Sequence, residues 1–375
     1  MLNNTKSSSN NIDYLLLFSY LSIAIFGLLT MSSFSTGNFF YKQLFWIFIG
    51  TFSFLICGRL DFSFLKNTKT VLFFYIFTNC LLLATLLFGD VINGSKAWIN
   101  FSTFSLQPAD FVKISLIILL AKYFSKRHIE IRYIRHVLIS FVYTLIPVSI
   151  TLLQPDFGSA MVMLLIWFIM VFMSGLSKKH FLAMCIIGAL VLSVLWVSVF
   201  KNYQKERLLN FLEPLRDIQG SGYNVFQSEI AIGSGGLYGK GVGYGTQSRL
   251  NFLPEHETDF IFAAYAEEWG FVGSVILCGL FLTILLRILF IATSQNNNFF
   301  TLISIGVFAW IFIHSVINIG MNLGALPVTG IPLPFMSYGG SHFLAECIAL
   351  GIVASFNLNK FNIKKNHKNE FFGLE

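Results

Sequence analysis

Five carboxylates lie within fourteen residues of an otherwise apolar chain. They are Glu255, Glu257, Asp259, Glu267 and Glu268. Three precede a long hydrophobic run and two lie inside it, and an acid in or beside a membrane span is costly enough to be a functional candidate. A carboxylate can deprotonate an attacking hydroxyl, so the stretch 251–270 predicts acid–base chemistry at the end of a membrane helix. A solvated acidic loop end is the alternative, but it does not explain the two acids inside the run.

The composition around these acids is that of a membrane protein. The chain has 375 residues, of which 55% are hydrophobic and 11% charged, whereas a soluble domain carries roughly 25% charged residues. The net charge of +7 comes from basic residues in short loops between apolar runs. These residues form no basic patch, so no nucleic-acid partner is expected. The five Cys form no Cys-x-x-Cys motif, and neither a disulfide framework nor a metal site is indicated.

The apolar runs predict an all-α polytopic membrane protein, with about ten transmembrane helices in a single domain, 1–375. The expected spans are 14–33, 40–58, 70–88, 108–124, 137–153, 158–174, 180–200, 260–292, 299–324 and 340–357. Helices are required because lipid offers the backbone no hydrogen-bond partners. The runs are continuous and do not alternate, which argues against a β-barrel.

The distribution of Lys and Arg predicts a cytoplasmic location for both termini, residues 1–13 and 358–375. No small-residue cleavage site follows the first apolar run, so we interpret it as a span and not as a signal peptide. The large extracytoplasmic loop, residues 201–259, then connects helices 7 and 8. Part of it is glycine-rich, and the interleaved apolar residues favour packing onto the bundle over a flexible linker. No P-loop is present, because Gly239-Lys240 is followed by glycine.

Other polar residues fall on the same predicted outer side. Asp110 and Lys113 open the fourth span three residues apart, so they share a helix face and can pair; a dipole-favoured acid beside a snorkelling Lys is the alternative. Asp156 lies in the turn between spans five and six, where a functional role and a simple helix cap are both open. Between spans nine and ten, residues 326–341 hold three Pro and three Gly. Such broken backbone is tolerated at membrane depth only where it is buried or lines a cavity.

In these motifs the chain resembles the RodA/FtsW (SEDS) family of membrane glycosyltransferases. The matching motifs include Gln154-Pro155-Asp156-Phe157-Gly158, Thr258-Asp259-Phe260-Ile261-Phe262 and Ser337-Tyr338-Gly339-Gly340-Ser341. They occur in the family's order, from near Gly94 to Gly351. The segment 327–334 is more similar to the elongation member, RodA, than to the division member, FtsW.

The resemblance implies polymerisation of lipid II, an undecaprenyl-pyrophosphate-linked disaccharide-pentapeptide, at the outer face of the cytoplasmic (inner) membrane. Undecaprenyl pyrophosphate would be released, and the product would serve cell-wall elongation and rod shape. The family's essential acid falls on Asp259. Candidates for contacting the substrate, including cations for the pyrophosphate, are Asp110, Lys113, Asp156, Arg207, Lys240, Gln247, Glu255, Thr258 and Ser337.

Partners and cofactors are also implied by the resemblance. The expected partners are a class B penicillin-binding protein, which is a transpeptidase, and other membrane proteins of the elongation complex. No cofactor is certain, and a divalent cation, Mg²⁺ or Mn²⁺, is an open expectation. The chain departs from the family pattern at Ala97, Asp110, Glu229 and Glu257. These departures concern substrate contacts, because the essential acid is present.

Two other classes of function compete with the enzyme. A lipid-linked precursor flippase or a proton-coupled carrier would use Asp110, Lys113, Glu267 and Glu268 as a relay. A carrier needs a site near the midplane with access from both sides, whereas the polar candidates here crowd one side. A scaffold for a wall-synthesis complex is the third interpretation, and it would not require the acids. A division-specific polymerase remains the alternative within the family.

Overall fold

The computed structural model describes residues 12–34, 39–92, 94–101, 104–126, 134–175, 182, 186, 188, 221–250 and 252–371; of residues 92, 101, 104, 221 and 357–371 it describes the backbone alone. The helices in these ranges are α1 (Tyr14–Ser32), α2 (Phe39–Arg59), α3 (Thr68–Phe88), α4 (Pro108–Ser125), α5 (Ile134–Leu153), α6 (Phe157–Met173), α9 (Ser221–Gly235), α10 (Thr246–Arg249), α11 (Ile261–Ser294), α12 (Asn298–Asn322) and α13 (Gly340–Phe371). A short 3₁₀ helix, η1 (Phe62–Lys66), precedes α3.

The predicted all-α membrane fold is confirmed in the described part of the chain. Six of its helices, α1, α2, α3, α5, α11 and α12, are long and apolar enough to cross a membrane, and two shorter apolar helices cover Phe157–Met173 and Gly340–Phe356. The expected seventh span, 180–200, lies outside the described residues except for 182, 186 and 188. Arg207 in the large loop also lies outside them.

A small antiparallel sheet, which the pattern of apolar runs did not predict, joins α3 to α4. Its strands are β1 (Asp90–Ile92), β2 (Ser95–Phe101) and β3 (Phe104–Leu106), with Asp90 opposite Trp98 and Ile99 opposite Leu106. These strands are too short to be detected as apolar runs. The amide of Lys96 donates to the carbonyl of Gln154 at 3.1 Å, which ties the sheet to the turn between α5 and α6.

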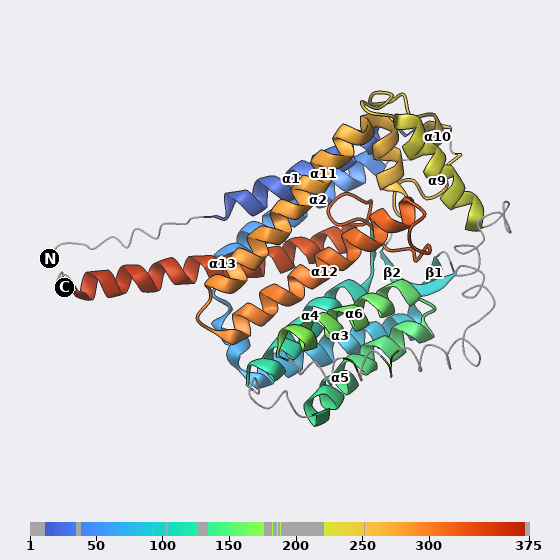
Figure 1. Cartoon of the computed structure of the whole chain (residues 1–375). Coiled ribbons are helices and arrows are strands. Elements are labelled where there is room, and N and C mark those ends of the chain that lie inside the picture. The colour runs from blue at the N-terminus through green and yellow to red at the C-terminus, as the bar shows by residue number, and fades with distance from the viewer. Residues whose placement is uncertain are drawn as a thin grey trace.

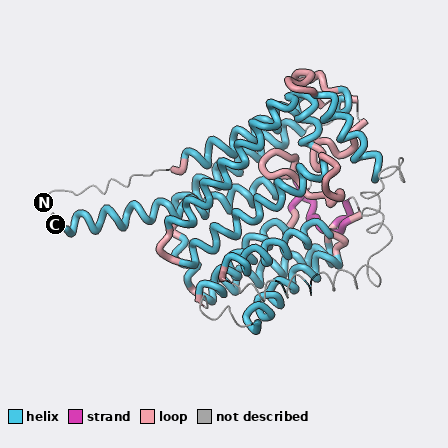
Figure 2. The backbone as a smooth tube through the Cα atoms, viewed as in Figure 1, coloured by secondary structure: helices cyan, strands magenta, loops and turns pink. Residues whose placement is uncertain are grey.

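The elements that carry the candidate residues gather at one end of the bundle. Figure 1 shows α9, α10 and the strands at this end, whereas α1 begins and α13 ends at the opposite end. Figure 2 shows loop segments beside the strands at the end that carries α9 and α10. One of them is residues 323–339, between α12 and α13, which we call the proline-rich loop. The candidate residues therefore depend on loops held by a helical frame.

Helix α4 lies at the centre of this frame. It packs against α3, α6, α12 and α13, and 13 of its 18 residues are buried. Asp110 and Lys113 are therefore interior residues although they stand in the first turns of the helix. By contrast, α2 has 4 buried residues out of 21, and several of its other apolar side chains, such as Phe45, Phe48 and Phe52, are exposed as a lipid-facing helix requires.

Helices α2 and α13 pack closely because glycines leave room between them. A Cβ built on Gly50 of α2 would lie 2.5 Å from the ring of Phe343, and one on Gly351 of α13 would lie 2.7 Å from Cβ of Cys57. Small residues at such positions let membrane helices approach where lipid provides no hydrophobic driving force. This packing fixes the position of α13, whose first turns contribute to the buried part of the site.

Helix α11 is not the single uninterrupted span that the apolar run 260–292 predicted. Gly270 has φ 67° and ψ −163°, so the helix breaks there and resumes with Phe271. The residues before the break are almost all buried, including Glu267 and Glu268. A glycine is needed at this break because few other residues adopt a positive φ.

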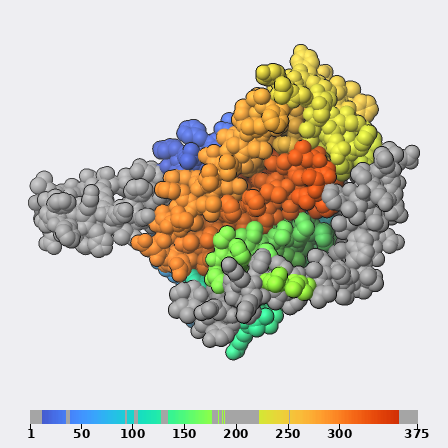
Figure 3. Space-filling model, viewed as in Figure 1, coloured from blue at the N-terminus to red at the C-terminus, as the bar shows by residue number. Residues whose placement is uncertain are grey.

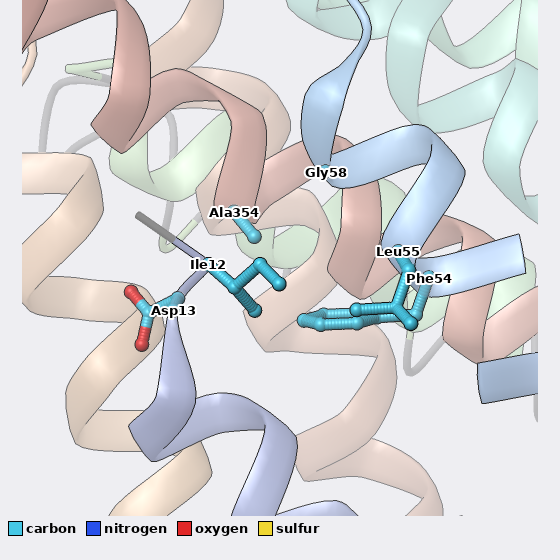
Figure 4. A pocket seen from close by; sticks show the side chains of 6 residues that line it. All are labelled: Ile12, Asp13, Phe54, Leu55, Gly58 and Ala354. Atoms are coloured by element: carbon cyan, nitrogen blue, oxygen red, sulfur yellow. The ribbon is translucent and has the colours of Figure 1, made fainter. Parts of the chain in front are cut away.

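The other end of the bundle holds a small hollow lined by residues of α2, α13 and the segment before α1. Figure 4 shows its lining side chains, Ile12, Asp13, Phe54, Leu55, Gly58 and Ala354. Asp13 accepts from the N-terminal turn of α1 at Leu16 and forms an ion pair of 2.9 Å with Arg287 of α11. This pair fastens α1 to α11, and the hollow lies away from the candidate residues.

Candidate active site

Asp259 lies in a tight turn, residues 253–260, which we call the acidic turn. Pro254 precedes Glu255, and Glu255 has a positive φ of 51°. The carbonyl of Glu255 accepts from the amides of Thr258 at 3.2 Å, Asp259 at 3.1 Å and Phe260 at 3.1 Å. The chain then enters α11 through Phe260 and Ile261, both fully buried. The apolar residues anchor the turn, and Asp259 is left half-buried at the mouth of the helix.

Two asparagines of α12 hold this turn from inside the bundle. Asn318 and Asn322 donate through Nδ2 to the carbonyl of Asp259, at 2.9 and 3.0 Å. Asn322 also accepts from the amide of Ala263 at 3.1 Å, which satisfies one of the free N–H groups at the start of α11. Both side chains are fully buried, so these bonds are shielded from competing water. The contact of these two asparagines with the acidic turn could not be read from the sequence.

The proline-rich loop covers the other side of the acidic turn. The Ser337 hydroxyl donates to the carbonyl of Thr258 at 2.6 Å and accepts from the amide of Leu333 at 2.8 Å. The amide of Tyr338 donates to the carbonyl of Glu257 at 2.8 Å. A Cβ built on Gly330 would lie 3.6 Å from Oδ2 of Asp259. The structure thus brings Ser337 to Thr258 and Asp259 from a distant part of the chain.

Side chains of the acidic turn are also linked to one another. The Glu255 carboxylate accepts from the Thr258 hydroxyl at 3.1 Å. His256 is buried in a T-shaped contact with the ring of Phe34. Its Nδ1 lies 2.7 Å from the Leu253 carbonyl, and its Nε2 lies 3.5 Å from the Glu257 carboxylate. Burial raises the pKa of nearby Tyr338, whose phenol therefore stays protonated at neutral pH. The turn presents several carboxylates on one ordered surface.

The predicted pair in α4 is present and is completely enclosed. Lys113 Nζ lies 3.0 Å from Asp110 Oδ1, and the side chain of each is 2% exposed. Lys113 also faces the ring of Trp310, 5.7 Å from its centroid. The second oxygen of Asp110 accepts from the Ser341 hydroxyl at 3.3 Å. The alternative of a snorkelling Lys is therefore wrong, because its ammonium does not reach the surface.

Three titratable residues that our sequence analysis missed surround this pair. His342 Nδ1 lies 3.1 Å from Asp110 Oδ1, and its Nε2 lies 2.9 Å from Glu346 Oε1. His314 of α12 stacks on His342 with ring centroids 4.8 Å apart. Two of these residues, His342 and Glu346, lie at i, i+4 spacing inside an apolar run. Titratable residues inside a membrane span are functional candidates, so this spacing could have revealed both of them. We call Asp110, Lys113, His342 and Glu346 the buried charge cluster.

Asp156 is connected to this cluster and is also a helix cap. Its Oδ1 accepts from the amide of Ser159 at 3.0 Å, so it is the N-cap of α6. Its Oδ2 accepts from Nε2 of Gln107 at 2.9 Å, and the backbone amide of Gln107 donates to Ser341 at 3.2 Å. A structural role for Asp156 is thus present in the structure, and a substrate contact remains a prediction.

Lys240 and Gln247 belong to a third group, centred on Glu267. One oxygen of Glu267 lies 2.7 Å from Lys240 Nζ and accepts from the Thr246 amide at 2.9 Å, while the other accepts from the Gln247 amide at 3.1 Å. Glu268 accepts from the amide of Gly243 at 3.0 Å. The glycine-rich segment, residues 236–245, thus makes its contacts here with Glu267 and Glu268. Figure 3 shows this yellow segment lying over one end of the orange α11.

The break at Gly270 explains how the glycine-rich segment attaches. It frees the carbonyls of Glu267 and Glu268, which accept from the amides of Lys240 and Gly241, both at 3.0 Å. The amides of Phe271 and Val272 beyond the break donate to the carbonyls of Gly236 at 2.9 Å and Leu237 at 3.1 Å. Groups that a broken helix would leave unpaired in the membrane are thereby satisfied. Glu267 and Glu268 are therefore anchors for this segment, and the interpretation of a loop end for them is wrong.

No group of three or more His, Cys, Asp or Glu side chains that could hold a metal ion occurs in the described part of the chain. The carboxylates of the acidic turn are nevertheless the oxygen donors that Mg²⁺ uses, and this ion is commonly bound by one or two carboxylates together with substrate phosphates. The half-buried Glu257 and Asp259 carboxylates are suitable donors for such an ion.

The described geometry is that of a polytopic membrane protein with an ordered acidic turn at one end of its bundle. Residues 11–362 match the model of the family FtsW/RodA/SpoVE, described as cell cycle proteins. The chain belongs to this family.

Three similar proteins are named as peptidoglycan glycosyltransferases. The chain is 36% identical to peptidoglycan glycosyltransferase MrdB of Escherichia coli over 78% of its own length and 79% of that protein's. It is 33% identical to peptidoglycan glycosyltransferase RodA of Treponema pallidum, over 93% and 98% of the two chains. It is 34% identical to a probable peptidoglycan glycosyltransferase FtsW of Coxiella burnetii, over 84% and 85%.

Solved structures agree with this membership. A chain from a peptidoglycan synthase complex, studied for the coordination of polymerization and crosslinking, superposes with a TM-score of 0.81 at 30% identity, over 93% of this chain and 98% of that one. The crystal structure of the rod shape determining protein RodA of Thermus thermophilus gives 0.69 at 28% identity, over 95% and 98%. The arrangement of elements described above is therefore that of known members of the family.

Proposed function

We propose that this protein polymerises lipid II into glycan strands with Asp259 as the general base. As a member of the family it is a peptidoglycan glycosyltransferase. The observation that carries the assignment of the base is the position of Asp259. Its backbone is held by Asn318 and Asn322 while its carboxylate is half-buried at the mouth of α11. A base in this position can meet a sugar outside the bilayer while the lipid tail of the substrate stays in it.

The proposed reaction is the attack of a sugar hydroxyl on the anomeric carbon of a second substrate. Asp259 takes the proton of the hydroxyl as the new glycosidic bond forms, and the bond from the anomeric carbon to the pyrophosphate oxygen breaks. Undecaprenyl pyrophosphate leaves as an anion that is already stabilised, so a protein acid is not required. General-base assistance of this kind typically contributes about 100- to 10,000-fold in rate.

The departing pyrophosphate needs positive charge, and the structure distinguishes two of the predicted cations. The Lys240 side chain is 29% exposed while it contacts Glu267, whereas the Lys113 side chain is 2% exposed and is bound to Asp110. Lys240 can therefore reach a phosphate without opening the bundle, and we favour it for this role. A divalent cation held by Glu257 or Asp259 would supply the same neutralisation when bound.

The orientation and role of the protein are part of the same proposal. The basic residues of the short loops support cytoplasmic termini, and this puts the acidic turn on the outer face of the membrane. The similarity of the segment 327–334 to the elongation member supports a role in elongation and rod shape, with division as the alternative. A partner that cross-links strands, a class B penicillin-binding protein, is supported by the matched chain from a synthase complex that couples polymerization and crosslinking.

Incubation of the purified full chain with lipid II tests the proposal. We expect a polymer that a muramidase digests to disaccharide units. The role in the cell is tested by expression in a rod-shaped bacterium depleted of its own elongation polymerase, where we expect restored rods. Rescue of a strain depleted of its division polymerase, without restored rods, would favour the division role.

A further inference from the structure

We infer that His342 and Glu346 of α13 are positioning residues for the acidic turn, acting through the backbone of the proline-rich loop. This inference rests on the proposed function, because it assigns to these residues the placement of Asp259. Neither residue contacts the acidic turn directly in the structure. The connection begins in the buried charge cluster, runs along the backbone of the proline-rich loop and ends in hydrogen bonds to Glu257 and Thr258, directly before Asp259.

The first step is the burial of His342 and Glu346 as a charged unit. The Glu346 side chain is 1% exposed and that of His342 is 7% exposed. Both ring nitrogens of His342 face carboxylate oxygens, Asp110 on one side and Glu346 on the other. Nδ1 is within hydrogen-bond distance of Asp110, and Nε2 is in ion-pair contact with Glu346, so an imidazolium at this position would lie between two carboxylates. With Lys113 the cluster then holds equal numbers of positive and negative groups, so Glu346 is compensated although it lies inside the bundle.

The second step leads from Glu346 to the proline-rich loop. The second oxygen of its carboxylate, Oε2, accepts from the amide of Phe335 at 2.9 Å. Phe335 has a φ of 59°, which is unusual for a bulky residue and persists only where the surrounding structure holds it. Its ring is buried against Tyr20 and Phe343. The carboxylate and this apolar contact together hold the backbone of the loop in its strained conformation.

The third step leads from Phe335 to the acidic turn. Two residues further along, Ser337 bonds to the Thr258 carbonyl at 2.6 Å, and Tyr338 then donates to the Glu257 carbonyl at 2.8 Å. The turn is therefore paired with the loop at two successive residues before Asp259. A shift of Phe335 would be transmitted to Ser337 and Tyr338, because the backbone between them is short.

Such a shift matters because the placement of a catalytic group sets its efficiency. A misplacement of about 1 Å, even when caused far from the reacting atoms, can lower a rate by roughly 100-fold. A residue that only stabilised the fold would instead change the amount or the melting temperature of the protein, and each folded molecule would keep its turnover. These two outcomes can be separated by experiment.

The main test compares Glu346→Leu with Glu346→Gln in the full chain, reconstituted in nanodiscs. Leucine removes the acceptor for the Phe335 amide, whereas glutamine keeps an acceptor for that amide and can donate to a neutral His342. We expect Glu346→Leu to lower kcat for lipid II polymerisation by about 10- to 100-fold per folded molecule, with KM changed by less than about threefold. Glu346→Gln should recover most of the wild-type kcat. Wild-type kcat in Glu346→Leu, or a loss confined to its melting temperature, would overturn the inference.

Amide hydrogen exchange of residues 257–260 and 331–338 provides a readout that does not depend on polymerisation. Glu346→Leu should raise exchange in both segments, and Glu346→Gln should not. If the wild type makes no polymer, the proposed function fails, and these exchange rates still decide whether Glu346 orders the turn. Unchanged exchange in both segments of Glu346→Leu would overturn the positioning role even if the wild type is an active polymerase.

Ser337→Ala keeps the inference testable if Glu346→Leu does not fold. This variant leaves the buried charge cluster intact and removes the bond from the loop to the Thr258 carbonyl. We expect a lower kcat at near-normal KM, together with faster exchange of residues 257–260. A higher KM with unchanged kcat would mark Ser337 as a substrate contact and would overturn the path proposed here.

Discussion

Nδ2 of Asn318 lies 2.9 Å from the carbonyl oxygen of Asp259 and 2.8 Å from that of Ile331. One buried amide therefore joins the acidic turn to the proline-rich loop. Both segments are irregular, and neither could keep its position at the end of a membrane helix without partners for its backbone. The placement of the candidate base depends on side chains of α12 that do not take part in the chemistry.

Replacement of Asn318 by Ala should impair both stability and activity. The buried Ile331 carbonyl loses its donor and the Asp259 carbonyl keeps only Asn322. The loss costs about 1–3 kcal/mol in the free energy of unfolding, and the turn is held less firmly. We expect the polymerisation rate per folded molecule to fall at least about tenfold. Asn79→Ala is the matched control, since Asn79 is also buried but bonds within its own helix to Tyr75. Equal rates in the two variants would show that Asn318 does not position the acid.

The pair of Asp110 and Lys113 should behave as a coupled unit. Each single change to Ala leaves an uncompensated charge inside the bundle, at a cost of roughly 3–5 kcal/mol. The double variant Asp110→Ala, Lys113→Ala should cost less than the sum of the two single changes. The measurement is a double-mutant cycle, in which thermal unfolding and turnover are compared for the wild type, the two single variants and the double variant. Strictly additive effects would be evidence that the two side chains do not interact.

The glycine-rich segment should be intolerant of a side chain at Gly239 in particular. Gly239 and Gly243 both have positive φ, 80° and 81°, but a Cβ on Gly239 would lie 2.1 Å from the Glu268 carbonyl oxygen, while nothing lies within 4 Å of a Cβ on Gly243. Gly243→Ala should therefore show only conformational strain, on the order of 1–2 kcal/mol, whereas Gly239→Ala should also detach the segment from α11. Hydrogen exchange across residues 236–250 measures the difference. Equal exchange in the two variants would contradict the attachment seen here.

Membrane topology provides an independent check of the proposed orientation. Single cysteines introduced at positions 220 and 130, in a chain whose own cysteines are replaced, can be labelled with an impermeant reagent in intact spheroplasts. We expect labelling at 220 and none at 130, because the basic loops should be cytoplasmic. Labelling at 130 without labelling at 220 would reverse the orientation and put the acidic turn inside.

Much of the frame could be predicted because a membrane imposes strong rules on sequence. Long apolar runs must be helices, and acids inside them must face the interior, so the six long spans and the pairing of Asp110 with Lys113 followed from spacing alone. The catalytic role of Asp259 was assigned from the family resemblance and remains a prediction.

The remaining features depend on contacts between distant parts of the chain. Gly270 looks like any glycine in an apolar run, and its break appears only when the glycine-rich segment supplies partners for the freed backbone groups. Glu267 and Lys240 stand 27 residues apart, so their ion pair could not be predicted from local spacing. The bond from Glu346 to the Phe335 amide requires the proline-rich loop to turn back onto α13. His342 and Glu346 themselves were detectable at i, i+4 spacing but were overlooked beside the more numerous acids of 251–270.

A side-by-side polymerisation assay of wild type, Asp259→Asn and Glu257→Gln tests the central claim most directly. Asparagine keeps the size and most hydrogen bonds of Asp259 but cannot accept the proton, so we expect this variant to fold, to bind lipid II and to lose about 100- to 10,000-fold in rate. Glu257→Gln should be much milder, because Glu257 occupies a position where the family varies. The three proteins are compared at equal amounts of folded material in the same lipid. Little or no polymer from Asp259→Asn alone is the predicted result, and near-wild-type polymer from that variant would contradict Asp259 as the catalytic base.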